Sequence, residues 1–314
     1  MPLHPLARRL LRFWEVPFLA ALGWWMYRLR MGSYALNVTE DRVYYMGTDP
    51  YFHLRALLVS LENFPRALRW DPWTFFPRGT FTGQFGTLFD QTLAAAVLVL
   101  TGGEPTRQFA ERALAVYPAV LGGLCIVPVY LVARRLFGNP GAVYASILLA
   151  ILPGSFFTRS VAAYGDHHVA ETLTSTLAVF GVLVAVERAR AAEATLVAWR
   201  AAPRRTLVGL AGWGALGALA LTVYFWTWPP AMLFVAILAG ALLLLVGLDH
   251  ARGRTSRGTA FAAAVVFGGA LLLVLPLRET SGFEVTWYSW TQPLSLFVPA
   301  LAIPAAALGS ERLA

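Results

Sequence analysis

Residues 113–133 read ALAVYPAVLGGLCIVPVYLVA, an apolar run without a charged side chain. A helix needs about 20 mostly apolar residues to cross a bilayer, because the hydrocarbon core is about 30 Å thick and each helical residue rises about 1.5 Å. This run therefore predicts a transmembrane helix. Two basic residues, Arg134 and Arg135, follow it directly, and a second apolar run begins at Pro140.

Outward from this run, the rest of the chain repeats the same pattern. Hydrophobic residues make up 58% of the sequence and charged residues 13%, with a mean hydropathy of +0.60, which is typical of membrane proteins rather than soluble ones. We predict an all-α, polytopic transmembrane helical bundle that forms one domain over residues 1–314, with about eight spans. The predicted spans are 13–29, 113–133, 140–157, 169–186, 207–225, 231–248, 260–277 and, shorter than the others, 294–308. The apolar stretch 86–100 carries Asp90, and we expect it to be an amphipathic or re-entrant helix at the membrane interface.

The arginines predict how the chain is oriented in the membrane, because cytoplasmic loops retain positive charge. With the N-terminus inside, every short arginine-rich segment falls on the cytoplasmic side. These arginines are Arg8, Arg9, Arg12, Arg134, Arg135, Arg188, Arg190, Arg200, Arg204, Arg205, Arg252, Arg254 and Arg257. The net charge of +8 is explained by this distribution, so we expect no nucleic-acid partner. The opposite, extracytoplasmic side then holds a long first outer loop, residues 30–112, and the segments 159–168, 226–230 and 278–292.

The first motif on the outer side is GTDPYFHLR, residues 47–55. An aspartate followed by proline suits the start of a helix, because the carboxylate can cap free backbone N–H groups while proline occupies the first turn. Asp49 is therefore either a helix cap or a functional carboxylate.

The second motif is RSVAAYGDHHVAE, residues 159–171, between two predicted spans. Acidic and histidine side chains near a membrane are costly unless they pair, bind a cation or line a wet cavity. Asp166 and His168 are separated by one residue, so both side chains can point to one side of an extended segment. Together with the distant Asp49 they offer oxygen and nitrogen ligands for a divalent ion. The alternative is that Asp166 caps the next helix and His168 lies at the interface.

A third feature is YFWTWPP, residues 224–230, at the outer end of a predicted span. Trp and Tyr favour the headgroup level of a bilayer, so an aromatic belt is the simpler interpretation. A binding surface for a sugar or a polyprenyl chain is the alternative. The same two interpretations apply to Trp73, Phe75 and Phe76.

These motifs resemble those of the catalytic subunit of N-oligosaccharyltransferases. Residues 47–55 resemble the first acidic motif of that family, and residues 159–171 resemble the second, in the Asp-x-His form of the single-subunit archaeal enzymes. The runs PRGT, residues 77–80, and GTLFD, residues 86–90, also fit. The resemblance implies a GT-C type membrane fold in the cell membrane. It also implies a glycosyltransferase that moves an oligosaccharide from a dolichyl or polyprenyl (di)phosphate carrier to Asn in an Asn-x-Ser/Thr acceptor polypeptide.

The resemblance also implies roles for individual residues. By position, Asp49, Asp166 and His168 would hold Mn²⁺ or Mg²⁺, and Arg159 would face the phosphate of the lipid-linked oligosaccharide, where guanidinium supplies paired donors. Asp49, Asp166 and Arg159 would be the catalytic residues. The substrate-binding residues would be Arg159, His167, Arg55, Trp226 and Trp228.

The sequence departs from the family pattern in its later part. The family's Thr-Ile-x-Glu glutamate motif and its Trp-Trp-Asp-Tyr-Gly motif, which lies in a soluble C-terminal domain, do not occur. The last outer segment offers Glu279 and Glu284 without matching the glutamate motif. We therefore expect the chain to correspond to the amino-terminal membrane part of such an enzyme, as a fragment or split gene.

One acceptor sequon, Asn37-Val38-Thr39, lies on the predicted outer side and is a candidate glycosylation site.

Two other functions remain open. Another GT-C glycosyltransferase, such as a protein O-mannosyltransferase or a lipid-sugar transferase, would not require the Asp-His-His-Val-Ala-Glu run. A transporter would place ionisable residues near the middle of its spans, whereas here they cluster at span ends.

Overall fold

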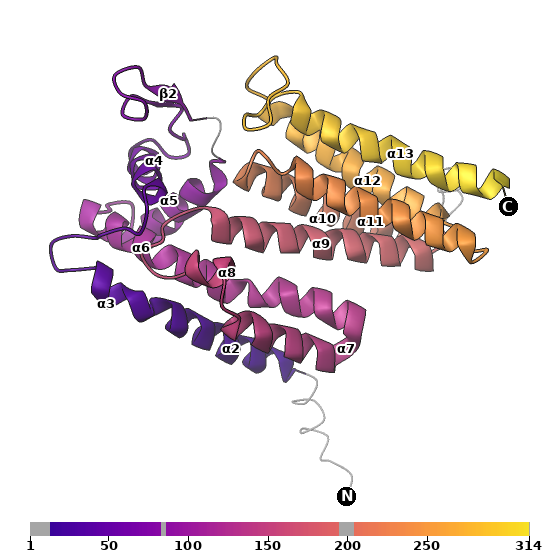
Figure 1. The fold of residues 1–314 in the computed structure, drawn as a ribbon, viewed down its shortest axis with the longest axis horizontal. Coiled ribbons are helices and arrows are strands. Elements are labelled where there is room, and N and C mark those ends of the chain that lie inside the picture. Colours follow the sequence, from indigo (N-terminus) through magenta and orange to yellow (C-terminus); the bar gives the residue numbers. More distant parts are fainter. Residues whose placement is uncertain (1–12, 83–85, 195–203, 314) are drawn as a thin grey trace, which may run out of the picture. The chain divides into compact units, whose positions relative to one another are not determined.

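A computed structural model describes residues 13–82, 86–194 and 204–313 (Figure 1). Apart from two short strands and irregular loops, these residues form helices, in agreement with the predicted all-α class. Arg8, Arg9, Arg12 and Arg200, which contributed to the predicted orientation, lie outside the described residues. The chain divides into two compact units, one formed by Met1–Ala67 with Asp90–Leu173 and the other by Leu68–Phe89 with Thr174–Ala314.

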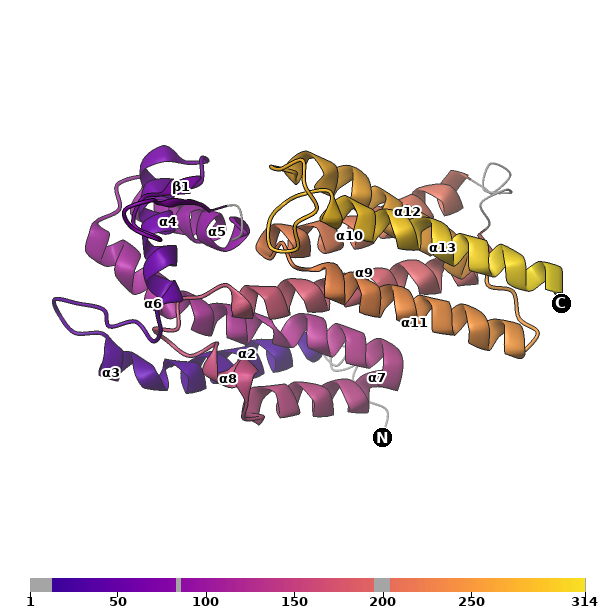
Figure 2. The same ribbon diagram turned by 45° about the horizontal axis from the view of Figure 1, so that its top comes forward.

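The first unit carries both acidic motifs. Its elements are α2 (Glu15–Arg30), η1 (Met31–Ser33), α3 (Tyr34–Asn37), α4 (Asp49–Asn63), most of α5 (Leu88–Thr101), α6 (Arg107–Leu124), α7 (Ile126–Ile151), α8 (Ser155–Thr158) and the first turns of α9 (His168–Ala191). Helix α2 packs against α6 and α7, and α4 packs against α6 (Figure 2). Gly138 has a φ of 71°, a left-handed conformation that favours glycine, and it interrupts the helix just before Pro140. This break falls in the loop predicted between the spans 113–133 and 140–157.

The second unit is a bundle around an apolar core. Besides the rest of α9, it contains β1 (Trp70–Asp71), β2 (Thr80–Phe81), α10 (Arg204–Thr227), α11 (Met232–Ala251), α12 (Arg257–Val274), η3 (Leu275–Leu277) and α13 (Thr291–Leu313). Helix α12 lies between α10 and α13 in the contact pattern, and α12 and α13 run side by side in Figure 1. The two strands pair antiparallel, with Trp70 opposite Phe81. Among the fully buried core residues are Leu221, Phe225, Phe267, Leu296 and Ile303.

Six helical stretches among the described residues are long and apolar enough to cross a membrane. They are Arg107–Ile151, His168–Ala191, Val208–Thr227, Met232–Ala251, Arg257–Leu277 and Thr291–Ser310. The first of them contains the predicted span 113–133 and most of the predicted span 140–157, because the chain stays helical on both sides of the break at Gly138. The predicted span 13–29 corresponds to α2, which has 16 residues. The apolar stretch that carries Asp90 forms α5, and with 14 residues it is too short to span. The count of eight spans stays a prediction.

Helices α9 and α10 come into close contact at two glycines. A Cβ atom added to Gly181 would lie 2.8 Å from the Cα of Gly217, which is closer than real Cβ contacts. Without side chains at these positions the two backbones can touch, as small residues allow in membrane helices.

We expect Gly181→Val to destabilise the protein by about 1–3 kcal/mol, because the added carbons force the two helices apart. The matched control is Gly240→Val on α11, where an added Cβ meets nothing within 4 Å. The free energy of unfolding of both variants is measured in mixed detergent micelles. Equal loss of stability in the two variants would show that the close approach is not the cause.

Candidate metal centre

The loop that carries the second motif is fixed by main-chain hydrogen bonds to three other segments. The Ala162 N–H donates to the carbonyl oxygen of Arg30 at the end of α2 (2.9 Å). The Ala163 N–H donates to the carbonyl oxygen of Ala115 in α6 (2.7 Å), and the Met46 N–H, just before the first motif, donates to the Ala163 carbonyl oxygen (2.9 Å). The two motifs are therefore tied to one framework within the first unit.

Arg30 lies fully buried beneath this loop. Its Nε donates to the hydroxyl oxygen of Ser160 (2.7 Å), and its guanidinium carbon lies 5.0 Å and 5.1 Å from the ring centroids of Phe156 and Phe157. A Cβ atom on Gly122 would come within 2.8 Å of the Arg30 side chain, so the glycine leaves the space that Arg30 occupies. Sequence reasoning treated Arg30 only as the start of the outer loop and missed this role.

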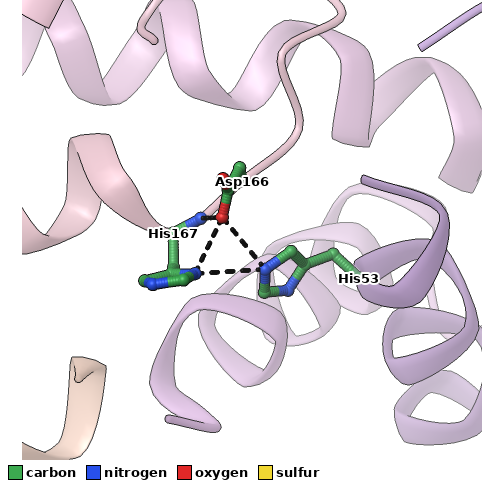
Figure 3. Close-up of side chains that lie close together, drawn as sticks. All are labelled: His53, Asp166 and His167. Carbon is green, nitrogen blue, oxygen red and sulfur yellow. Dashed lines mark hydrogen bonds and ion pairs between the residues drawn. The ribbon is translucent and has the colours of Figure 1, made fainter. Parts of the chain in front are cut away.

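Asp166 is the centre of the cluster in Figure 3, and it is 1% exposed. Its Oδ1 accepts a hydrogen bond from the His167 backbone N–H (2.6 Å) and lies 2.7 Å from His167 Nδ1 and 3.3 Å from His53 Nε2. Its Oδ2 lies 3.2 Å from His168 Nε2. Burial alone would raise the pKa of Asp166, but the hydrogen bonds from His167 and His53 outweigh it and hold that pKa well below its usual value.

His53 joins the first motif to the second. It is fully buried, and its Nδ1 lies 2.9 Å from Oδ1 of Asp90, which is 4% exposed. Burial lowers the pKa of His53, whereas the charge of Asp90 and hydrogen bonds to Asp166 and Asp90 raise it, with a net rise to about 10. Sequence reasoning assigned no role to His53 or Asp90. The available signals were the spacing of four residues from Asp49, which places His53 on the same helical face, and an acid inside the apolar stretch 86–100.

His168 and Glu171 form the more accessible side of the cluster, with side chains 27% and 24% exposed. His168 Nδ1 lies 3.4 Å from Glu171 Oε2, across the first turn of α9. Two groups of side chains among the described residues bring metal-ligating atoms within 4.8 Å of one another: His53, Asp166 and His167, and His167, His168 and Glu171. Carboxylate oxygens and imidazole nitrogens of this kind suit divalent cations. Glu171 was quoted in the second motif but was not predicted as a ligand.

A cavity of about 330 Å³ opens beside His168. Its lining residues are Ser155, Phe156, Arg159, His168, Val169, Glu171 and Thr172. Arg159, predicted to face a phosphate, and His168, predicted to bind a metal ion, therefore line the same space. A guanidinium beside a candidate cation site can bind an anionic group that the cation also contacts.

Asp49 stands at the exposed start of α4, four residues before His53. The cap position falls on Thr48, and no side-chain capping bond is present there, so the capping alternative has no support at this helix. Thr48 Oγ1 donates to Asp49 Oδ1 (3.2 Å). Neither compact group of ligating atoms found in the described segments includes Asp49. Its role as a third metal ligand stays a prediction.

The remaining predicted residues lie elsewhere. In the first unit, Arg55 Nη1 donates to the Tyr51 carbonyl oxygen (3.3 Å), and Asn37 Nδ2 donates to the Ser33 carbonyl oxygen (2.8 Å). Trp226 and Trp228 belong to the second unit, where Trp226 Nε1 donates to Thr87 Oγ1 (2.8 Å) and Trp228 packs against the core. The binding roles of Arg55 and the two tryptophans, and glycosylation of Asn37, stay predictions.

The aromatic run 224–230 differs from a simple belt. Tyr224 and Phe225 are buried in the core of the second unit, because α10 packs against α12 along this face. By contrast, Trp73, Phe75 and Phe76 are exposed, so both interpretations of these three residues remain open.

Comparison with known proteins places these features in a family. The family model described as oligosaccharyl transferase STT3, N-terminal, matches residues 21–289. The chain is 35% identical over 310 residues to the dolichyl-monophosphooligosaccharide–protein glycotransferase AglB of Haloferax volcanii, covering 97% of this chain and 29% of the relative. It is 27% identical to dolichyl-phosphooligosaccharide-protein glycotransferase 3 of Archaeoglobus fulgidus, covering 92% of this chain and 32% of the relative. The chain thus spans about a third of the length of these curated relatives.

Solved structures show the same fold. The archaeal oligosaccharyltransferase AglB from Archaeoglobus fulgidus, in complex with an inhibitory peptide and a dolichol-phosphate, matches with a TM-score of 0.80 at 25% identity, over 96% of this chain and 33% of that chain. A structure of the A. fulgidus oligosaccharyltransferase in complex with Zn and sulfate matches with a TM-score of 0.76 at 24% identity, over 93% of this chain and 35% of that chain. The expected GT-C type membrane fold is confirmed.

Proposed function

Because the chain belongs to the STT3 family of oligosaccharyl transferases, we propose that it transfers an oligosaccharide from a dolichyl or polyprenyl phosphate carrier to asparagine in Asn-x-Ser/Thr. The observation that carries this proposal is the meeting of the two acidic motifs. His53 of the first motif lies 3.3 Å from Asp166 of the second, across 113 positions in the sequence (166 minus 53). A shared buried contact between motifs so distant in the chain is what one common site requires.

The residues present fit a divalent metal ion. Asp166 Oδ2 and His168 Nε2 lie 3.2 Å apart, with Glu171 beside His168. His167 Nε2 is buried without a hydrogen-bond partner among the described residues, which leaves a ligand atom available next to them. Asp166 and His168, with Asp49 one helical turn from His53, would hold Mn²⁺ or Mg²⁺. When bound, the ion would stabilise negative charge on the departing phosphate as a Lewis acid.

The chain's own residues would bind and orient the two substrates. Arg159, on the wall of the cavity, would bind the carrier phosphate through paired N–H donors, and His167 would contact the same group. Asp49 would accept a hydrogen bond from the acceptor amide, which weakens the conjugation of its nitrogen with the carbonyl. Trp226 and Trp228 would contact the sugar or the polyprenyl chain, since aromatic faces suit such ligands, and Arg55 would contact a polar part of the substrate through its N–H donors.

The protein is a multi-pass membrane protein, and its orientation is part of the proposal. The arginine-rich segments would be cytoplasmic, together with the N-terminus. Both acidic motifs would then lie on the extracytoplasmic face, where carrier and acceptor meet.

The test combines donor binding and transfer with the purified chain in lipid nanodiscs. We expect binding of a lipid-linked oligosaccharide that is lost in EDTA and restored by Mn²⁺ or Mg²⁺, and any transfer to a peptide containing Asn-x-Thr should show the same metal dependence. Asp41→Asn, an exposed acid in the same outer loop, is the matched control and should behave as wild type. Donor binding or transfer that is insensitive to EDTA would favour another GT-C transferase. No binding of any lipid-linked sugar would contradict the proposal.

A further inference from the structure

Asp90, His53 and Asp166 are buried in contact with one another beside the candidate metal centre, and His53 Nε2 also lies 3.3 Å from His167 Nδ1 (Figure 3). Asp90 Oδ1 lies 2.9 Å from His53 Nδ1, and His53 Nε2 lies 3.3 Å from Asp166 Oδ1. The side chains of His53, Asp166 and Asp90 are 1%, 1% and 6% exposed. His53 belongs to α4, Asp90 to α5 and Asp166 to the loop before α9, all within the first unit. The two nitrogens of an imidazole point in fixed, different directions, so a partner on Nδ1 determines where Nε2 points.

The two oxygens of Asp166 have different surroundings. Oδ1 is surrounded by His53 Nε2, the His167 backbone N–H and His167 Nδ1, whereas Oδ2 faces His168 Nε2. His168 lines the cavity together with Arg159 and Glu171, whereas His53 and Asp166 do not. A cation and a phosphate in this cavity would meet His168, and Oδ2 of Asp166 lies directly behind it, 3.2 Å from His168 Nε2. His53 stands on the other side of the carboxylate.

We propose that Asp90 and His53 are a positioning pair that turns the Asp166 carboxylate so that Oδ2 faces the cation site at His168. This inference rests on the proposed metal-dependent function and adds to it two residues that do not themselves bind the ion. Carboxylates and backbone groups that orient metal-bound side chains usually matter for affinity: changing one typically costs 10–100-fold in metal affinity. The competing assignment is that His53 is itself a ligand, together with Asp166 and His167.

The experiment measures Mn²⁺ binding by the purified full chain and the coordinated nitrogens of bound Mn²⁺ by electron spin-echo envelope modulation. Asp90→Asn keeps the size of the side chain but removes its charge, and His53→Gln removes the ring. We expect each to raise the Kd for Mn²⁺ about 10–100-fold while the imidazole nitrogen signal of the bound ion stays unchanged. His168→Gln, which changes an expected ligand, should remove that signal. Asp41→Asn controls for the loss of one carboxylate charge in the outer loop.

The outcomes separate the possibilities. Loss of nitrogen signal in His53→Gln would make His53 a ligand and overturn the positioning role. A wild-type Kd in both Asp90→Asn and His53→Gln would overturn it as well. If neither the wild-type protein nor the variants bind Mn²⁺, the proposed metal centre itself fails, and the inference fails with it. Thermal unfolding of each variant is measured without metal. The affinities for Mn²⁺ are then compared at a temperature well below the lowest unfolding midpoint, so that a loss of folded protein is not mistaken for a misoriented Asp166 carboxylate.

Discussion

Asp166→Asn is expected to abolish metal-dependent donor binding and transfer, with a loss of more than about 100-fold. The reason is that changes in residues that only orient a metal ligand typically cost 10–100-fold, and Asp166 would be a ligand itself. Asparagine has the same size, and its amide oxygen can still accept the His167 backbone N–H that now donates to Oδ1 at 2.6 Å. The loss therefore comes from the missing charge toward His168 and not from a collapsed loop. Binding of lipid-linked oligosaccharide and transfer, each titrated with Mn²⁺, measure the effect.

Two controls make this result specific. Asp41→Asn removes a carboxylate from the same outer loop at an exposed position and should bind the donor as wild type does. Membrane insertion should be unaffected in Asp166→Asn, because the loop that holds Asp166 is fixed by main-chain hydrogen bonds from Ala162 and Ala163. Transfer at the wild-type rate in Asp166→Asn would remove Asp166 from the proposed site.

The helices and the neighbourhood of Asp166 follow from local sequence patterns. An apolar run of about 20 residues has few stable alternatives to a helix in a bilayer, so the residues of the predicted spans are largely helical, although the span 113–133 is divided between α6 and α7. The contact between Asp166 and His168 also follows from local spacing, because residues i and i+2 of an irregular segment can face one direction. Gly138 before Pro140 marks the break in α7 for a similarly local reason.

The contacts behind the site do not follow from local patterns. His53, Asp90 and Asp166 are 37 and 76 positions apart along the chain (90 minus 53, 166 minus 90), and one sequence contains no signal for which distant polar groups pair. The sequence predicts Arg30 at the start of the outer loop, yet it is fully buried under the loop 156–162 because Gly122 leaves space for it. Buried polar contacts of this kind depend on tertiary packing, which hydropathy and spacing do not encode.

A second buried ionic contact, far from the acidic motifs in sequence, holds three helices of the second unit together. Arg190 near the end of α9 makes a bidentate ion pair with Asp249 of α11, with Nη1–Oδ2 and Nη2–Oδ1 distances of 2.5 Å and 3.0 Å. Arg190 Nη1 also donates to Thr259 Oγ1 of α12 (3.1 Å). The Asp249 side chain is 3% exposed, whereas that of Arg190 is 30% exposed. Removing Arg190 therefore leaves a buried charge without a partner, whereas removing Asp249 leaves a charge that water can reach.

We expect Arg190→Leu to destabilise the protein by about 3–5 kcal/mol, because it leaves the carboxylate of Asp249 buried without its cation. Asp249→Leu should cost less, since the partly exposed guanidinium of Arg190 can turn toward water. The double variant should recover much of the loss, because a buried ion pair replaced by apolar groups is often neutral in stability. Arg252→Leu, at an exposed position just after α11, controls for the loss of one positive charge, and unfolding in mixed micelles compares all four variants. Additive effects of Arg190→Leu and Asp249→Leu would mean that the two side chains stabilise the bundle independently, whereas strong non-additivity would show that the buried carboxylate of Asp249 depends on the cation of Arg190.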